Sequence, residues 1–128
     1  MKKSRILISL LLTVGSFSVG AQSLVKTSWR GYYGDPINDT ITIHYLKDSS
    51  YVTSSKGDTL VVSKNYMIRD TVRIADIGGQ YQCPPEGTYT YVIIGNTLHF
   101  ILVSDDCEGR QAIQDIIWTR VAEPKKKK

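Results

Sequence analysis

The feature that most constrains this chain is a series of eight short runs of β-forming residues. The runs read LVKTSWRGYY, DTITIHYLK, SYVTS, DTLVVS, YMIRDTVRIAD, GTYTYVII, TLHFILV and DIIWTRV, with turn-rich pieces such as GDPIN, KDSS and SKGD between them. Runs of this length that are bounded by Gly, Pro, Asn, Asp and Ser predict β-strands. We find no helical pattern longer than a turn or two, although EGRQAIQD could form one short turn. The chain is therefore expected to be all-β.

Eight short antiparallel strands can close into one barrel or split into two packed sheets. Closure removes exposed strand edges, so we predict an eight-stranded antiparallel up-and-down barrel, with a two-sheet sandwich as the alternative. Successive joins in such a barrel alternate between its two ends. The joins IGGQYQCPPE and SDDCEGRQAIQ follow the fifth and seventh strands. Both joins are therefore expected at the same, loop-rich end.

The stretch TYTYVIIGNTLHFILV predicts a hairpin whose register follows from its turn. Gly95 and Asn96 tolerate positive φ and suit a two-residue loop. One face then carries Tyr89 opposite Leu102, Tyr91 opposite Phe100 and Ile93 opposite Leu98, while the other face carries Thr88 opposite Val103, Thr90 opposite Ile101 and Val92 opposite His99. The first face is larger and more aromatic, so we turn it inward. Its side chains either fill a core or line a ligand pocket.

The amino terminus has the three parts of a secretory signal. Basic residues come first, residues 6–14 are mostly apolar, and small residues at 19–21 precede a cut before Gln22. The apolar run is far shorter than the roughly 20 residues that span a bilayer, so we predict no transmembrane segment. We expect residues 1–21 to be a signal peptide and the protein to be secreted or periplasmic, with a buried amino-terminal helix as the alternative.

Removal of the signal changes the charge of the protein. Three of the 16 basic residues belong to the signal and four are Lys125, Lys126, Lys127 and Lys128, which leaves nine basic against twelve acidic residues. This body lacks the distributed basic surface that nucleic-acid binding needs. We expect one domain at residues 22–121 and a disordered polybasic tail at 122–128. The tail either keeps the protein soluble or contacts an anionic surface at about 1 kcal/mol per lysine.

Cys83 and Cys107 are the two cysteines of the chain. In the hairpin register they lie one residue away from direct opposition, a gap that a bulge or a three-residue turn would close. A lone cysteine pair in an exported protein most often forms a disulfide. We predict this bond, which would add about 3 to 3.5 kcal/mol in the chain-entropy model. It would clip two loops across the barrel mouth, with the charges of SDDCEGR facing water.

The reactive residue types do not assemble into a catalytic pattern. A disulfide-bonded Cys107 cannot act as a thiolate nucleophile. His44 and His99 lie in separate strands with outward parity, whereas zinc needs three or four convergent ligands. We therefore predict no enzyme activity and no metal or cofactor.

The acidic segment around Cys107 leaves two interpretations open. Asp105, Asp106 and Glu108 supply the hard oxygen ligands that calcium prefers. Arg110 follows closely, so an ion pair of Asp105 or Asp106 with Arg110 is the simpler interpretation.

The motif GTYTYVIIGNTLHFILVSDDCEGR, followed by WTR, resembles the carboxyl-terminal half of short bacterial secreted lipocalin-like domains of the calycin superfamily. The matching residues are Gly87, Tyr89, Tyr91, Gly95, Leu98, Asp105, Cys107, Arg110, Trp118 and Arg120. The stretch TSWRGYY also resembles a first lipocalin strand. The resemblance implies that Trp29 closes the narrow end of the barrel, with Arg120 over its ring in a cation–π contact worth about 0.5 to 2 kcal/mol.

Two functions follow from these expectations. The first is a secreted lipocalin-like barrel that binds a small, mostly apolar ligand in its interior, lined by Tyr89, Tyr91, Leu98, Phe100 and Leu102. The second is a protein-binding module, such as a hydrolase inhibitor, that acts through the disulfide-clipped loops. An eight-stranded barrel is either just filled by its side chains or holds one small ligand. The volume of the interior therefore distinguishes the two.

Overall fold

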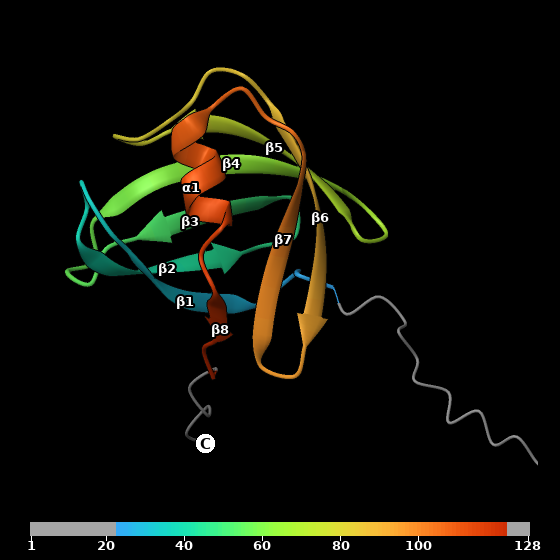
Figure 1. The fold of residues 1–128 in the computed structure, drawn as a ribbon, viewed down its shortest axis with the longest axis horizontal. Coiled ribbons are helices and arrows are strands. Elements are labelled where there is room, and N and C mark those ends of the chain that lie inside the picture. The colour runs from blue at the N-terminus through green and yellow to red at the C-terminus, as the bar shows by residue number, and fades with distance from the viewer. Residues whose placement is uncertain (1–22, 123–128) are drawn as a thin grey trace, which may run out of the picture.

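The computed structural model of the protein describes residues 23–122, which form a closed antiparallel barrel with one short helix (Figure 1). Its elements are β1 (Ser28–Tyr33), β2 (Asp39–Tyr45), β3 (Ser49–Thr53), β4 (Thr59–Ile68), β5 (Thr71–Gly78), β6 (Gly87–Ile94), β7 (Thr97–Ser104), α1 (Glu108–Gln114) and β8 (Trp118–Arg120). Each strand pairs with its neighbours in sequence, and β8 pairs with β1. The predicted up-and-down barrel is confirmed. The predicted signal peptide and the four tail lysines lie outside the described residues.

One predicted strand is in fact two. The run YMIRDTVRIAD contains the end of β4, a turn at Arg69 and Asp70, and most of β5. Arg69 has a φ of 57°, and its carbonyl oxygen accepts a hydrogen bond of 3.2 Å from the Tyr91 hydroxyl. The turn contains one turn-forming residue, Asp70, but neither Gly nor Asn nor Pro, so its signal is weak beside the continuous run of β-forming residues around it. The run DTLVVS is correspondingly the start of a longer strand.

The last part of the barrel differs most from expectation, because the final strand is shorter than predicted and EGRQAIQD forms a helix before it. The run DIIWTRV was predicted as a full strand, but β8 has three residues and pairs with β7 only at Thr97 and Leu98. The seven-residue α1 precedes it and lies beside β7 in Figure 1. A helix advances about 1.5 Å per residue against about 3.3 Å for a strand, and its backbone hydrogen bonds are internal. Within residues 23–122, no strand pairs with Phe100–Ser104 on the α1 side.

The core occupies the closed part of the barrel. Its largest fully buried side chains are Trp29, Trp118, Tyr45, Tyr89, Leu24, Ile41, Leu98 and Val72. The Arg120 guanidinium lies 4.6 Å from the centre of the Trp29 ring, the contact that the resemblance implies. Because Trp29 and Arg120 are also paired between β1 and β8, this contact lies on the seam where the barrel closes.

Gly31 of β1 allows the chain that returns from α1 to lie directly on the barrel wall. A Cβ at this position would overlap the Ile116 side chain and lie 3.1 Å from the Ile117 carbonyl oxygen. We predict that Gly31→Ala lowers the free energy of unfolding by about 1–3 kcal/mol, the usual effect of overpacking. Urea denaturation measures this change. The control is Gly34→Ala, because a Cβ there meets nothing within 4 Å. Equal stability of the two variants would contradict the assignment.

Candidate functional site

The β6–β7 hairpin has the predicted register over most of its length. Tyr89 lies opposite Leu102, and the pairs continue in step to Ile94 opposite Thr97. The expectation for Thr88 is wrong, because Thr88 lies opposite Ser104 rather than Val103. A bulge between Thr88 and Tyr89 causes the shift. The inward face that begins at Tyr89 is therefore placed as expected.

The predicted disulfide between Cys83 and Cys107 is confirmed, with the two Cα atoms 6.2 Å apart. The bulge between Thr88 and Tyr89 does not bring Cys83 opposite Cys107, because it shifts the pairing by one residue in the direction opposite to the one needed. Both cysteines instead lie beyond the ends of the paired strands, in the joins that follow β5 and β7. Cys107 is also the N-cap residue of α1, and its Sγ accepts a hydrogen bond from the Arg110 backbone amide. The bond thus fixes the start of the helix to the β5–β6 loop.

Arg110 is the centre of a buried network at this end of the barrel. Its side chain is 4 % exposed, yet it carries a full charge. One guanidinium nitrogen lies 2.9 Å from Asp105 Oδ1, and another lies 3.2 Å from Asp76 Oδ2 and 3.0 Å from the Cys83 carbonyl oxygen. The ion pair of Asp105 with Arg110 is therefore confirmed. The expectation that the charges of SDDCEGR face water is wrong for Asp105 and Arg110, because three acceptors from separate segments enclose the guanidinium, whereas Asp106 and Glu108 are exposed as expected.

Each carboxylate of the network also accepts hydrogen bonds from neutral donors. Asp76 accepts from the Ser63 hydroxyl at 2.7 Å and from the Cys83 amide at 2.8 Å. Asp105 accepts from the Tyr89 hydroxyl and from the Cys107 amide. Burial, reinforced by the bond to Asp105, raises the pKa of Tyr89 well above its ordinary value. The phenol therefore stays protonated and remains a donor.

The sequence contained a signal for one further member of this network and for the space beside another. Asp76 continues the inward face of β5 after Val72 and Ile74, so its parity places a carboxylate inside the barrel. A Cβ on Gly87 would overlap the Asp105 carboxylate, which explains why β6 begins with glycine.

Asp105 is committed to Arg110, and among residues 23–122 no group of three or more His, Cys, Asp or Glu side chains could hold a metal ion.

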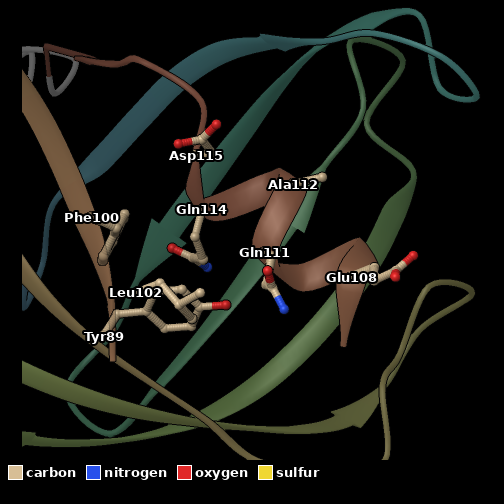
Figure 2. Close-up of a pocket in the computed structure, with 8 residues that line it drawn as sticks. All are labelled: Tyr89, Phe100, Leu102, Glu108, Gln111, Ala112, Gln114 and Asp115. Atoms are coloured by element: carbon tan, nitrogen blue, oxygen red, sulfur yellow. The ribbon is translucent and has the colours of Figure 1, made fainter. Parts of the chain in front are cut away.

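A cleft of about 340 Å³ lies between α1 and the inner face of the β6–β7 hairpin. Tyr89, Phe100 and Leu102 form one wall, as Figure 2 shows. The helix side contributes Glu108, Gln111, Ala112, Gln114 and Asp115. The cleft exists because α1 takes the place of a longer β8, so that a second β-strand does not cover this part of β7.

The five predicted ligand-binding residues separate into two groups. Tyr89, Phe100 and Leu102 line the cleft, whereas Tyr91 and Leu98 are buried in the core away from its lining. Leu102 is 49 % exposed because it lies beside the gap in the barrel wall. The helical half of the lining was not among the predicted site residues, since EGRQAIQD was expected to form one short turn at most.

A second, much smaller cavity lies inside the barrel. It measures about 20 Å³ and is lined by apolar side chains together with Ser50, Ser63, Asp76, Arg110 and Gln114. A space of this size holds about one water molecule. Gln114 borders both the inner cavity and the cleft, so its side chain separates them.

Comparisons of the chain with protein-family models, with curated proteins and with solved structures give no match. Among residues 23–122, no helix has the length and apolar character needed to cross a membrane. The geometry of the cleft and of the Arg110 network therefore carries the functional argument.

Loss of the buried arginine should destabilise the protein far more than loss of a surface arginine. We predict that Arg110→Met lowers the free energy of unfolding by about 3–5 kcal/mol, because Asp76 and Asp105 then remain buried without their cation. The control is Arg73→Met. Arg73 pairs with Glu86 on the surface, where both side chains are more than half exposed, so its loss should amount to about 0–1 kcal/mol. Urea denaturation compares the two variants, and similar losses would show that the network is not essential.

Proposed function

We propose that the protein binds a small, largely apolar molecule in the cleft between α1 and the β6–β7 hairpin. The observation that carries this proposal is the contrast between the two walls. Tyr89, Phe100 and Leu102 offer an apolar surface, and α1 offers a few polar groups opposite it. Small-molecule sites typically measure about 300–1,000 Å³ and combine apolar walls with a few polar groups. A cleft of about 340 Å³ lies within that range.

The proposed site lies in the wall of the barrel rather than in its interior. The inner cavity of about 20 Å³ is too small for a ligand larger than water. Tyr91 and Leu98 then support the site from the core, and Tyr89, Phe100 and Leu102 contact the ligand. The rings of Tyr89 and Phe100 meet edge to face, with 6.2 Å between their centres, and such packing fixes the shape of the wall.

We include export and a lipocalin-like character in the proposal. A disulfide in a small domain suits the periplasm or the outside of the cell. An eight-stranded up-and-down barrel is also the architecture of lipocalins. Architecture alone supports many functions, so the cleft remains the stronger argument.

Protein binding is a second candidate, favoured by the open edge of β7. Within residues 23–122, the backbone of Phe100–Ser104 has no strand partner on the α1 side. Ile101, Leu102 and Val103 are all exposed, and no charged residue interrupts them. An edge of this kind accepts an extended strand from a partner. Such a strand would contact side chains on both faces of β7, whereas a ligand in the cleft would contact only Leu102 and its neighbours on the inner face.

The test compares two adjacent residues of β7. Leu102 faces the cleft, and Ile101, which is 58 % exposed, faces the opposite side of the sheet. The uncharged fluorescent probe N-phenylnaphthylamine should bind the protein with a saturable signal. We predict that Leu102→Ser weakens this binding about tenfold, since the lost apolar contact is worth roughly 1.4 kcal/mol. The matched control Ile101→Ser should leave the dissociation constant unchanged.

Both substitutions remove an exposed aliphatic side chain from the same strand, so their effects on folding should be similar. Absence of saturable binding would refute the cleft as an apolar site. Equal weakening by the two variants would instead favour binding along the edge of β7.

A further inference from the structure

The cleft has a negative polar side. Glu108 and Asp115 lie near the two ends of α1 and are both lining residues of the cleft, although in Figure 2 the Glu108 side chain points away from Tyr89, Phe100 and Leu102. No Lys, Arg or His is among the residues that line it. Within residues 23–122, neither carboxylate forms an ion pair, although the acidic groups of the Arg110 network do. An occupant of the cleft therefore meets uncompensated negative charge.

Gln114 adds a buried acceptor at the same place. Its side chain is 5 % exposed and extends from α1 toward Leu102 and Tyr89 in Figure 2. Its Oε1 atom has no hydrogen-bond partner among the described residues. A buried acceptor without a donor is unfavourable, so this atom is available to accept a hydrogen bond from a group in the cleft.

Besides Gln114 itself, the side chains of the cleft wall that can donate hydrogen bonds are Tyr89 and Gln111, and both already form one. The Tyr89 hydroxyl donates to Asp105 Oδ2. The side-chain amide of Gln111 donates to the Asp105 carbonyl oxygen at 2.6 Å. The Tyr89 hydroxyl cannot donate to Gln114 without losing its bond to Asp105, and the second N–H of Gln111 does not reach Gln114 Oε1.

From these features we propose that the cleft selects amphiphiles with a primary ammonium head group. This selectivity rests on the proposed function, because it assumes that the cleft binds a small ligand. The apolar chain lies on Tyr89, Phe100 and Leu102. The head group donates a hydrogen bond to Gln114 Oε1 and lies beside Asp115. Glu108, about 10 Å away along the helix axis, adds negative potential without direct contact.

A primary ammonium group suits this environment for three physical reasons. It has three N–H donors and no acceptor, so it satisfies Gln114 and still has donors for a carboxylate. Its hydrogen bonds are charge-assisted and therefore stronger than those of a hydroxyl group. The faces of Tyr89 and Phe100 also attract cations. An anionic head group would be repelled by Glu108 and Asp115 and would offer no donor to Gln114.

The test uses three ligands with the same eight-carbon chain and different head groups: octylammonium, octanol and octanoate. Isothermal titration calorimetry at neutral pH measures their dissociation constants with the purified protein. We expect octylammonium to bind about tenfold tighter than octanol, as a charge-assisted hydrogen bond allows, and octanoate to bind most weakly. An increase from about 10 mM to about 1 M salt shortens the Debye length from roughly 30 to 3 Å. The advantage of octylammonium over octanol should therefore shrink.

Two variants identify the responsible groups. Asp115→Asn should weaken octylammonium binding severalfold and leave octanol unchanged. The control Asp48→Asn makes the same substitution in the β2–β3 turn, and Asp48 is absent from the lining of the cleft. It should change neither affinity. Gln114→Met keeps a side chain of similar length but removes the acceptor, so it should weaken both octylammonium and octanol.

The outcomes separate this selectivity from the proposed function. If none of the three ligands binds, the cleft is not a small-molecule site and the proposed function fails. If all three bind with equal affinity, or octanoate binds best, the site stands and the ammonium selectivity is refuted. The selectivity is also refuted if Asp115→Asn behaves like Asp48→Asn.

Discussion

The burial of the Arg110 guanidinium between Asp76 and Asp105 is the interaction on which the open end of the barrel depends. The arginine comes from α1, one carboxylate from β5 and the other from the segment after β7. The side chain of Arg110 thus joins β5 to the segment of chain that leads from β7 into α1. Buried ion pairs add little net stability compared with apolar packing, but they impose a strict geometry. Here that geometry determines where α1 lies against the barrel.

The position of α1 explains both the cleft and the exposed edge of β7. A full-length β8 would have paired with β7 beyond Leu98 and covered its inner face from the side. The backbone of the helix instead forms its hydrogen bonds within the helix, and Arg110, Ile113 and Gln114 are its buried residues. Glu108, Gln111, Ala112 and Asp115 line the cleft together with Gln114, which also borders the inner cavity. The presence of α1 in place of a longer β8 therefore gives the cleft one apolar wall, from the hairpin, and one polar wall, from the helix.

Local sequence signals predicted the parts of this fold that local residues determine. Gly95 and Asn96 were sufficient to give the register of most of the β6–β7 hairpin, because turn length dictates pairing. The turn at Arg69 and Asp70 was missed, since Asp70 is the only turn-forming residue in an otherwise continuous run of β-forming residues. The pairing of Asp105 with Arg110 was visible from their spacing.

The burial of that pair was not visible, because its second carboxylate, Asp76, comes from another strand. The helical side of the cleft was missed for a related reason. EGRQAIQD has only weak helical character of its own, and tertiary contacts through Cys107 and Arg110 decide its conformation. The apolar side of the cleft was predicted correctly as an inward face, but its partner across the cleft depended on the element that was missed.

The attachment of α1 at both ends has a consequence for the thermodynamics of association. The disulfide at Cys107 holds its start, and the pairing of Trp118 with Leu98 holds the chain that leaves it. Both sides of the cleft are thus in position before any molecule enters, so little conformational entropy of the protein is lost on binding. For a pre-organised site, the unfavourable entropy comes mainly from the guest. Stiffer ligands of the proposed site should therefore gain affinity from their own rigidity, without an offsetting rearrangement of the barrel.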